Sequence, residues 1–264
     1  MKAKLFVTDM DGTLLNSERR ISDGNKAAIK KAVEAGVIFT IATGRMHASA
    51  LPFAQELGVE VPIITYNGAL IKTTAGKEIY ASYLEPELVK ELVAFCWEKG
   101  FHVHLYSDDK LYFREDNEKA RYYQHACGVT GEIVGDRLLE YTARVPKLLM
   151  MSDTPEEGET MMQAVREHFG SRIETVKSAP TYMELLKPGV TKASAIAKLA
   201  EIMEVPEEQV LAIGDSGNDI PMLKAAAFGV AMGNATPEAR AAAKYSVADC
   251  DHDGLAEAVE RFCL

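Results

Sequence analysis

The sequence predicts an α/β fold built on a parallel sheet, with an α+β segment inserted into it. Short apolar runs alternate with helix-forming stretches over residues 1–82 and again over residues 187–264. Such alternation is typical of βαβ units and a parallel sheet. Between the two parts, over residues 83–186, the alternation is looser and the composition is more aromatic. We therefore expect a discontinuous core domain (1–82 and 187–264) and an inserted domain (83–186).

Length, composition and charge fit a globular protein without a nucleic-acid partner. The chain has 264 residues, of which 47% are hydrophobic and 26% charged, which allows a substantial core. Its formal net charge is −10 with no basic patch, which argues against nucleic acid. No apolar run approaches the roughly 20 residues that span a bilayer, and no signal-peptide pattern is present. We expect a cytoplasmic protein with no membrane partner, and the oligomeric state stays open.

The cysteines point to the same compartment. All four are widely spaced, and none forms a Cys-x-x-Cys pair. We predict free thiols in a reducing environment. They are Cys96, Cys127, Cys250 and Cys263.

The first part of the core should contain three strands with helices between them. Apolar runs at residues 4–8, 37–42 and 62–66 predict buried strands. The first helix can be capped by Ser22 or Asp23. Each strand ends in polar or glycine residues, and ligands of open α/β sheets bind at that end of the strands.

The inserted segment should form an α+β domain, with a hairpin around residues 107–110. Helices are expected at residues 86–99, 117–126 and 156–169. Strands are expected at residues 102–106, 111–113, 133–134, 146–151, 173–176 and 182–186.

The βα alternation resumes after residue 187. Strands are predicted at residues 209–213 and 228–232. Helices are predicted from about residue 192 to 203, from 220 to 226, after Pro237, and from 253 to 262.

Two carboxylates follow the first strand. Asp9 and Asp11 stand two residues apart and are followed by Gly12. In an extended segment such side chains point the same way, and they repel unless a cation or proton lies between them. This suits Mg²⁺ together with one carboxylate that is free for chemistry. Taken alone, the run could also be a strand followed by an Asp-Gly turn.

Other strand ends carry groups that suit phosphoryl transfer. Such a reaction needs charge neutralisation and positioning of the phosphoryl oxygens. A lysine and a hydroxyl can hold these oxygens, and a divalent cation can neutralise nucleophile and phosphate together. The residues at strand ends are Thr43, Asn67, Asp215, Asn218 and Asp219, and Lys192 lies on the predicted helix that re-enters the core.

Four separated motifs resemble those of the haloacid dehalogenase (HAD) superfamily. They are Asp9-x-Asp11-Gly12-Thr13-Leu14, Thr43-Gly44-Arg45, Lys192, and Gly214-Asp215-x-x-Asn218-Asp219. Their order and spacing resemble the Cof-type phosphatases, which have a Rossmann-like core and a C2-type cap. The resemblance covers essentially the whole chain. It implies Mg²⁺-dependent hydrolysis of small phosphorylated metabolites, such as sugar phosphates.

The resemblance also implies roles for the acidic residues. Asp9 would be the nucleophile that forms an aspartyl-phosphate. Asp11 would protonate the leaving oxygen and later deprotonate water. The Asp9 carboxylate, the Asp11 carbonyl and Asp215 would hold Mg²⁺, with Asp219 in its outer coordination sphere.

The remaining motif residues would bind phosphate. Thr43 and Lys192 would contact the phosphoryl oxygens, Gly44 would let a backbone N–H approach them, and Asn218 would lie beside Lys192. Arg45 would contact substrate or cap, although it could equally be a solvated first-turn residue.

Three further residues are possible contacts. Asn67 is a candidate phosphate contact, but Asn-Gly is also a strong turn signal by itself. Asn234 is an open case for the same site, and Glu184 is a candidate substrate contact on the last strand of the insert.

Rival interpretations remain. A phosphomutase shares this core chemistry. A non-hydrolytic protein that binds or senses a phosphorylated ligand would be expected to lack Asp9 or Asp11, and both are present. A response-regulator receiver would be about half as long. The sequence leaves the metabolite and the breadth of specificity open.

Overall fold

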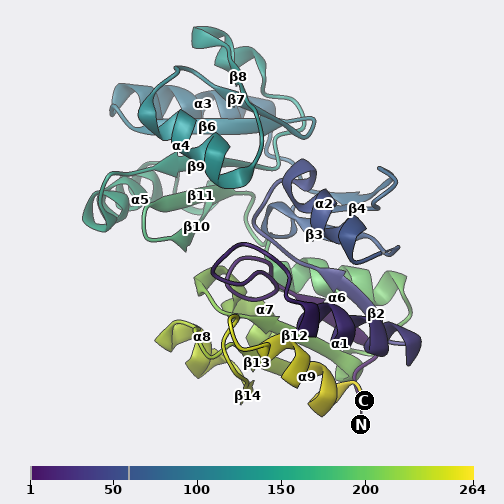
Figure 1. Ribbon diagram of the computed structural model, residues 1–264. Helices are drawn as coiled ribbons and strands as arrows, with labels where there is room; N and C mark the ends of the chain where they lie inside the picture. Colours follow the sequence, from purple (N-terminus) through teal and green to yellow (C-terminus); the bar gives the residue numbers. More distant parts are fainter. Residues whose placement is uncertain (1, 59) are drawn as a thin grey trace. The chain divides into compact units, whose positions relative to one another are not determined.

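The computed structural model describes residues 2–58 and 60–264. Positions 1 and 59, which the sequence assigns to the core domain, lie outside the described residues. The chain divides into two compact units (Figure 1). The core unit comprises Met1–Gly44, Ala50–Tyr80 and Thr191–Leu264, and the inserted unit comprises Arg45–Ser49 and Ala81–Val190.

A five-stranded parallel sheet organises the core unit. Its strand order is β14-β13-β12-β1-β2, and every neighbouring pair is parallel. The predicted apolar runs form its strands because they are buried on both faces. The strands are β1 (Leu5–Thr8), β2 (Ile38–Ile41), β12 (Val210–Gly214), β13 (Phe228–Ala231) and β14 (Tyr245–Ser246).

The register of the central strands determines where the site lies. Thr8 of β1 pairs with Ile213 of β12 on one side and with Ile41 of β2 on the other. The residues that follow these three strands therefore meet at one edge of the sheet. This is the carboxyl edge, where ligands of open α/β sheets bind.

Helices cover both faces of the sheet (Figure 1). On one face, α1 (Asp23–Glu34) and α9 (Gly254–Phe262) pack onto a buried cluster that includes Phe6 and Phe39. On the other, α6 (Lys192–Ile202) and α7 (Ile220–Ala225) pack onto a second cluster. α8 (Pro237–Ala242) also belongs to the core unit, and α2 (His47–Glu56) belongs to it from Ala50 onward. As predicted, Ser22 caps α1 and accepts a hydrogen bond from the Asn25 N–H.

The third predicted strand belongs to a different sheet. β3 (Ile63–Thr65) pairs antiparallel with β4 (Leu70–Lys72), and β5 (Glu78–Ala81) completes a three-stranded sheet. One isolated parallel bridge, Ala42 to Ile64, connects β3 to the end of β2. The chain reverses after β3 because Asn67 and Gly68 both have positive φ angles, 56° and 104°.

The inserted unit is an α+β structure. Its six-stranded sheet has the order β10-β11-β9-β6-β7-β8, antiparallel except for the β7–β8 pair. Helices α3 (Pro86–Glu98) and α5 (Pro155–Phe169) pack on one apolar face, and α4 is Glu118–Cys127. The strands are β6 (His102–Ser107), β7 (Lys110–Phe113), β8 (Glu132–Ile133), β9 (Lys147–Met151), β10 (Glu174–Ala179) and β11 (Tyr182–Leu186).

Two simple expectations can be compared with the described residues. All four cysteines are free thiols, as predicted. Among the helices described, none has the length and apolar character needed to cross a membrane.

Candidate active site

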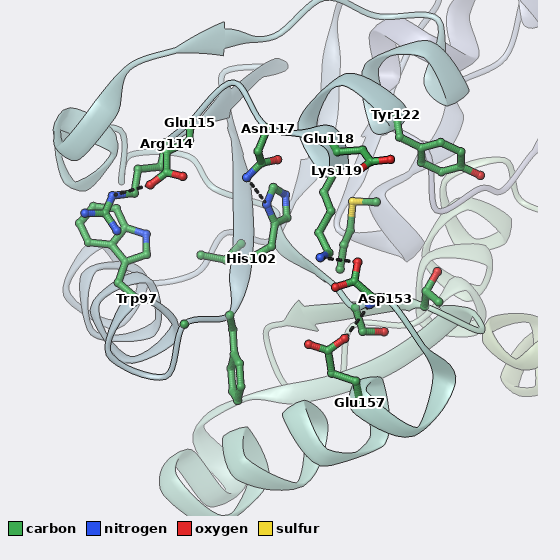
Figure 2. Close-up of a pocket in the computed structure, with 16 residues that line it drawn as sticks. Trp97, His102, Arg114, Glu115, Asn117, Glu118, Lys119, Tyr122, Asp153 and Glu157 are labelled. Carbon is green, nitrogen blue, oxygen red and sulfur yellow. Dashed lines mark hydrogen bonds and ion pairs between the residues drawn. The ribbon is translucent and has the colours of Figure 1, made fainter.

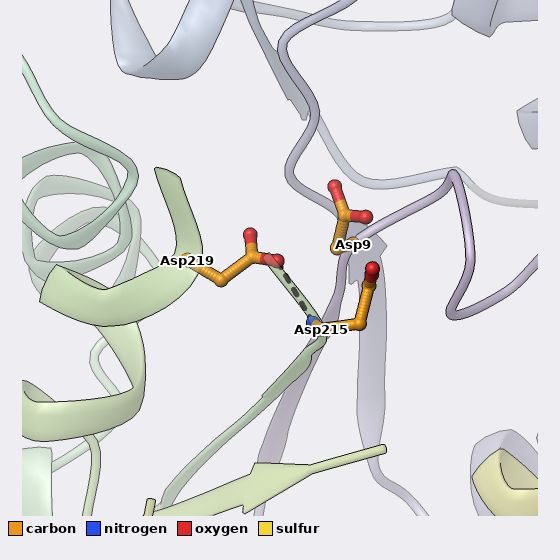
Figure 3. A group of neighbouring side chains, drawn as sticks. All are labelled: Asp9, Asp215 and Asp219. Atoms are coloured by element: carbon orange, nitrogen blue, oxygen red, sulfur yellow. Dashed lines mark hydrogen bonds between the residues drawn. The ribbon is translucent and has the colours of Figure 1, made fainter. Parts of the chain in front are cut away.

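Three aspartates converge at the carboxyl edge of the parallel sheet (Figure 3). Asp9 directly follows β1, Asp215 directly follows β12, and Asp219 lies in a 3₁₀ turn that leads into α7. One carboxylate oxygen from each lies within 4.8 Å of the others. The sheet register therefore brings together acids that are about two hundred residues apart in sequence.

A buried lysine joins two of these acids. Lys192 is the first residue of α6, which is capped by the Thr191 side chain. Its Nζ lies 2.5 Å from Oδ1 of Asp9 and 2.6 Å from Oδ1 of Asp219. The Lys192 side chain is fully buried, so these ion pairs are shielded from solvent.

The four groups carry more negative than positive charge. Burial, followed by the Asp219 charge, raises the pKa of Asp9 well above its usual value, and Lys192 only partly opposes this. Burial and then Asp219 raise the pKa of Asp215 to about 7. Burial lowers the pKa of Lys192, but Asp219 and Asp9 outweigh it and leave that pKa raised, so the lysine is charged. Three carboxylates sharing one ammonium group make a site that suits an additional cation.

The contacts of Asp219 separate it from the other two acids. Its Oδ1 accepts a hydrogen bond from Lys192. Its Oδ2 accepts from the backbone N–H groups of Asp215 and Ser216, at 2.9 and 3.0 Å. Because both oxygens are engaged within the protein, Asp9 and Asp215 are better able to bind a cation directly.

The loop after β1 confines the Asp215 carboxylate. The Thr13 hydroxyl donates to Oδ1 of Asp215 at 2.8 Å. Gly12 has a φ angle of 78°, and a Cβ at this position would lie 2.8 Å from Oδ2 of Asp215. A larger residue at 12 would therefore collide with the acid. Thr13 was part of the first motif in the sequence but was given no role, although a hydroxyl directly after an Asp-x-Asp-Gly run was a usable signal.

Asp11 differs from Asp9 in its surroundings. Asp9 is 4% exposed, whereas Asp11 is exposed. The expectation that both point the same way holds only for an extended chain, and β1 ends at Thr8. The chain then turns, since the Thr13 and Leu15 N–H groups both donate to the Met10 carbonyl. This turn separates the buried acid from the one that is open to solvent.

A second group of predicted residues gathers at the end of β2. Thr43 is buried, and its backbone bonds to both Ile64 and Asn67. The Asn218 side-chain amide donates to Oδ1 of Asn67 at 3.0 Å. Asn218 was expected beside Lys192, and the partners that the structure gives for its side chain are Asn67 and Ser216. Gly44 follows Thr43 and is half-buried.

The turn at Asn67 and Gly68 packs closely against the start of the helix that carries Lys192. A Cβ on Gly68 would lie 2.2 Å from the Thr191 carbonyl oxygen. Because Thr191 caps α6 and Lys192 begins that helix, this close approach fixes the start of the helix that carries the lysine.

Two predicted contacts belong to the inserted unit. Arg45 lies in that unit, and its role stays a prediction. Glu184 lies on β11 and is 3% exposed. Its Oε2 lies 2.5 Å from Nζ of Lys147, so the structure gives it a buried ion-pair partner.

The inserted unit also contains a pocket of about 700 Å³ (Figure 2). Its lining includes aromatic and charged side chains, and several of the polar groups bond to one another. Lys119 pairs with Asp153, and the Asn117 amide lies 3.3 Å from Nδ1 of His102. Burial lowers the pKa of His102 to about 4, so its ring is neutral. In each of these two pairs the groups are engaged with each other, and the catalytic and phosphate-binding residues predicted from the sequence are not part of this lining.

Comparison with known proteins shows that the chain is similar to phosphatases of one hydrolase family. The family model described as haloacid dehalogenase-like hydrolase matches residues 6–259. A Streptococcus pyogenes protein provisionally named a phosphatase is 32% identical, and the alignment covers 100% of both chains. The HMP-PP phosphatase of Serratia proteamaculans is 29% identical, over 89% of this chain and 85% of that protein.

Solved structures agree in fold. A haloacid dehalogenase-like hydrolase from Bacteroides thetaiotaomicron superimposes with a TM-score of 0.89 at 30% identity, covering 98% of this chain and 99% of that one. A structure described as a HAD subclass IIB sugar phosphatase gives a TM-score of 0.86 at 29% identity, with 98% of each chain covered. The fold class predicted from the sequence is confirmed.

Proposed function

We propose a reaction for this chain from one premise: it belongs to the haloacid dehalogenase-like hydrolases and is an enzyme of their phosphatase type. In this proposal it hydrolyses small phosphorylated metabolites with the help of Mg²⁺ and through an aspartyl-phosphate on Asp9. The observation that carries the proposal is the cluster of three carboxylates and one buried lysine at the carboxyl edge of the sheet.

The donor set fits a hard divalent cation. Mg²⁺ prefers oxygen ligands and is commonly held by one or two carboxylates together with substrate phosphate. Asp9, Asp215 and the Asp11 carbonyl would hold the ion, with Asp219 outside its direct ligands. When bound, Mg²⁺ supplies charge neutralisation at the nucleophile and at a phosphoryl oxygen.

Asp9 is the proposed nucleophile. Its carboxylate oxygen attacks phosphorus, and the bond from phosphorus to the leaving oxygen breaks. Asp11, in its acid form, donates a proton to that leaving oxygen and becomes a carboxylate. The exposure of Asp11 suits a group that must reach substrate.

The second half of the reaction regenerates the enzyme. The Asp11 carboxylate takes a proton from water, and the water oxygen attacks phosphorus. The bond between phosphorus and Asp9 breaks, inorganic phosphate leaves, and Asp11 is again an acid. The same side chain therefore acts once as general acid and once as general base.

The phosphoryl oxygens need their own contacts. Lys192, Thr43 and the backbone at Gly44 are the proposed partners, with the Asn67–Asn218 pair supporting this side of the site. Since Lys192 is buried and charged, its electrostatic effect on a developing negative charge is large.

The proposed substrate class follows the names of the relatives. They include an HMP-PP phosphatase, a 5-amino-6-(5-phospho-D-ribitylamino)uracil phosphatase of Bacillus subtilis that is 27% identical, and a sugar phosphatase. All three names describe small phosphorylated molecules. We propose that residues 83–186 act as a C2-type cap that selects among such molecules.

Phosphate release from a panel of small phosphorylated metabolites tests this function. We expect turnover of at least one with Mg²⁺, none after EDTA treatment, and recovery when Mg²⁺ is restored. The Asp9→Asn variant is the matched control and should remain inactive with Mg²⁺. Full activity after rigorous chelation would contradict the mechanism. Isomerisation of a sugar phosphate without phosphate release would identify a mutase instead.

A further inference from the structure

The segment between β13 and α8 contacts both metal-site loops. Within it, the Thr236 N–H donates to the Asp215 carbonyl at 2.8 Å. The side chain of Asn234 reaches the loop that carries Asp9 and Asp11: its Nδ2 donates to the Gly12 carbonyl at 2.8 Å. One short segment therefore holds the two loops whose carboxylates would share a cation.

The other end of the Asn234 amide is also engaged. Its Oδ1 accepts a hydrogen bond from the Cys250 N–H at 3.0 Å. The donor and the acceptor of one amide thus bind two backbone segments that are far apart in sequence. An aspartate could not donate to the Gly12 carbonyl, and an alanine could make neither bond.

The position of Gly12 makes this contact relevant to the metal site. Gly12 packs against the Asp215 carboxylate so closely that a Cβ would lie 2.8 Å from Oδ2. Its neighbours are Asp11, whose carbonyl is a proposed ligand, and Thr13, whose hydroxyl bonds to Oδ1 of Asp215. A displacement of Gly12 would therefore change the spacing between both sets of proposed ligands.

Charge repulsion at the site would tend to separate the two loops that Asn234 and its segment connect. The Asp9, Asp11 and Asp215 side chains repel one another, which favours separation of the two loops when no cation is bound. A neutral amide can hold the loops together without adding to the negative charge.

We propose that Asn234 is a positioning residue of the metal site: by holding Gly12 at a fixed distance from Asp215, it increases the affinity for Mg²⁺. This inference rests on the proposed function. Asn234 does not contact the reacting atoms, and its effect acts through Gly12 and Asp215.

A thermal titration with Mg²⁺ tests the proposal without substrate. The midpoint of unfolding is measured against Mg²⁺ concentration for the wild type, Asn234→Ala and Asn25→Ala. Loss of the exposed amide contacts should raise the Kd for Mg²⁺, fitted from the rise of Tm with Mg²⁺ concentration, about threefold. Steady-state kinetics should show the same shift in the Mg²⁺ requirement, with a smaller change in kcat at saturating Mg²⁺.

Asn25→Ala is the matched control. The Asn25 Oδ1 also accepts a backbone N–H of the core unit, that of Ala256 at 3.0 Å, but it has no partner among the metal-site residues. This variant should unfold at lower temperature and keep the wild-type Kd for Mg²⁺. If Asn234→Ala does not fold, Asn234→Ser is titrated in its place, because the shorter hydroxyl cannot span the two contacts.

Each outcome decides the inference. The inference is supported if the Kd for Mg²⁺ is raised in the Asn234 variant and not in Asn25→Ala. If Mg²⁺ stabilises both the wild type and the Asn234 variant with the same Kd, this inference is overturned and the proposed function is left intact. A wild type that Mg²⁺ does not stabilise overturns both.

Discussion

Two buried lysines, one in each unit, show how similar ion pairs can have different consequences. Lys192 of the core unit and Lys147 of the inserted unit each lie 2.5 Å from a carboxylate oxygen. Their side chains are 0% and 2% exposed. Distance and burial alone therefore do not distinguish them.

The number of carboxylates around each lysine distinguishes the two sites. Lys147 has Glu184 as its ion-pair partner, and the charges of that pair balance. Lys192 pairs with Asp9 and Asp219, and Asp215 lies within 4.8 Å of both. The core cluster therefore has an excess of two negative charges when all four groups are ionised. A balanced buried pair can be wholly structural, whereas excess negative charge at the carboxyl edge of a sheet, where ligands bind, fits the proposed cation.

Removing each lysine should expose this difference most strongly. Lys147→Met leaves Glu184 buried without its lysine, which should lower the free energy of unfolding by about 3–5 kcal/mol. Lys192→Met should also destabilise the protein in EDTA, but Mg²⁺ can neutralise the acids it leaves behind. We therefore expect Mg²⁺ to raise the Tm of Lys192→Met by more than it raises the Tm of the wild type. For Lys147→Met, the rise in Tm should equal that of the wild type.

Calorimetry with and without Mg²⁺ measures both effects. The double variant Lys147→Met/Glu184→Leu is the control for the inserted unit, because removing both charges should recover much of the lost stability. Equal Mg²⁺ responses in the two lysine variants would mean that the excess charge in the core does not bind the cation.

A smaller effect should appear as a pH dependence of the core cluster. The pKa of Asp215 is raised from 3.8 to about 7 in the folded protein. The folded state therefore holds this proton more tightly than the unfolded state, and the associated stability is lost as pH rises from about 4 to about 7. Under the proposed function Mg²⁺ would displace that proton, so we expect its stabilising effect to grow over the same pH range.

Measurements of Tm with EDTA and with Mg²⁺ across this range check the expectation. Asp215→Asn should show a weaker decline of Tm with pH in EDTA because the titrating group is gone. The Lys147→Met/Glu184→Leu variant should keep the wild-type pH dependence. A Mg²⁺ effect that is constant with pH would contradict the link to Asp215.

The features predictable from sequence are those with a local pattern. The apolar runs that form β1, β2, β12 and β13 are continuous and buried on both faces, and Ser22 caps α1 as its position indicates. The acids at strand ends were identifiable because parallel strands place their carboxyl ends together.

The partners of Thr13 and Asn234, two residues that the sequence had already singled out, could not be predicted because the contacts are long-range. Thr13 bonds to Asp215, and Asn234 bonds to the Gly12 carbonyl; these partners are 202 and 222 residues apart. No local spacing reveals such pairs. The short strands β4, β5 and β14 carry too few apolar residues to give a clear period.

Trapping the phosphorylated enzyme tests the central claim most directly. Asp11→Asn keeps the backbone carbonyl proposed to bind Mg²⁺ and removes the group that activates water. p-Nitrophenyl phosphate has a good leaving group and needs little help from an acid, so Asp9 should still be phosphorylated. Dephosphorylation should slow by about 10²–10⁴, and the intermediate should accumulate.

Rapid quenching followed by peptide mass spectrometry identifies the modified residue. The mechanism predicts a phosphoryl group on Asp9 in Asp11→Asn, formed with Mg²⁺, absent with EDTA, and absent in the Asp9→Asn/Asp11→Asn double variant. Turnover of the aryl phosphate with no phosphorylated Asp9, or with the phosphoryl group on another residue, would contradict the mechanism.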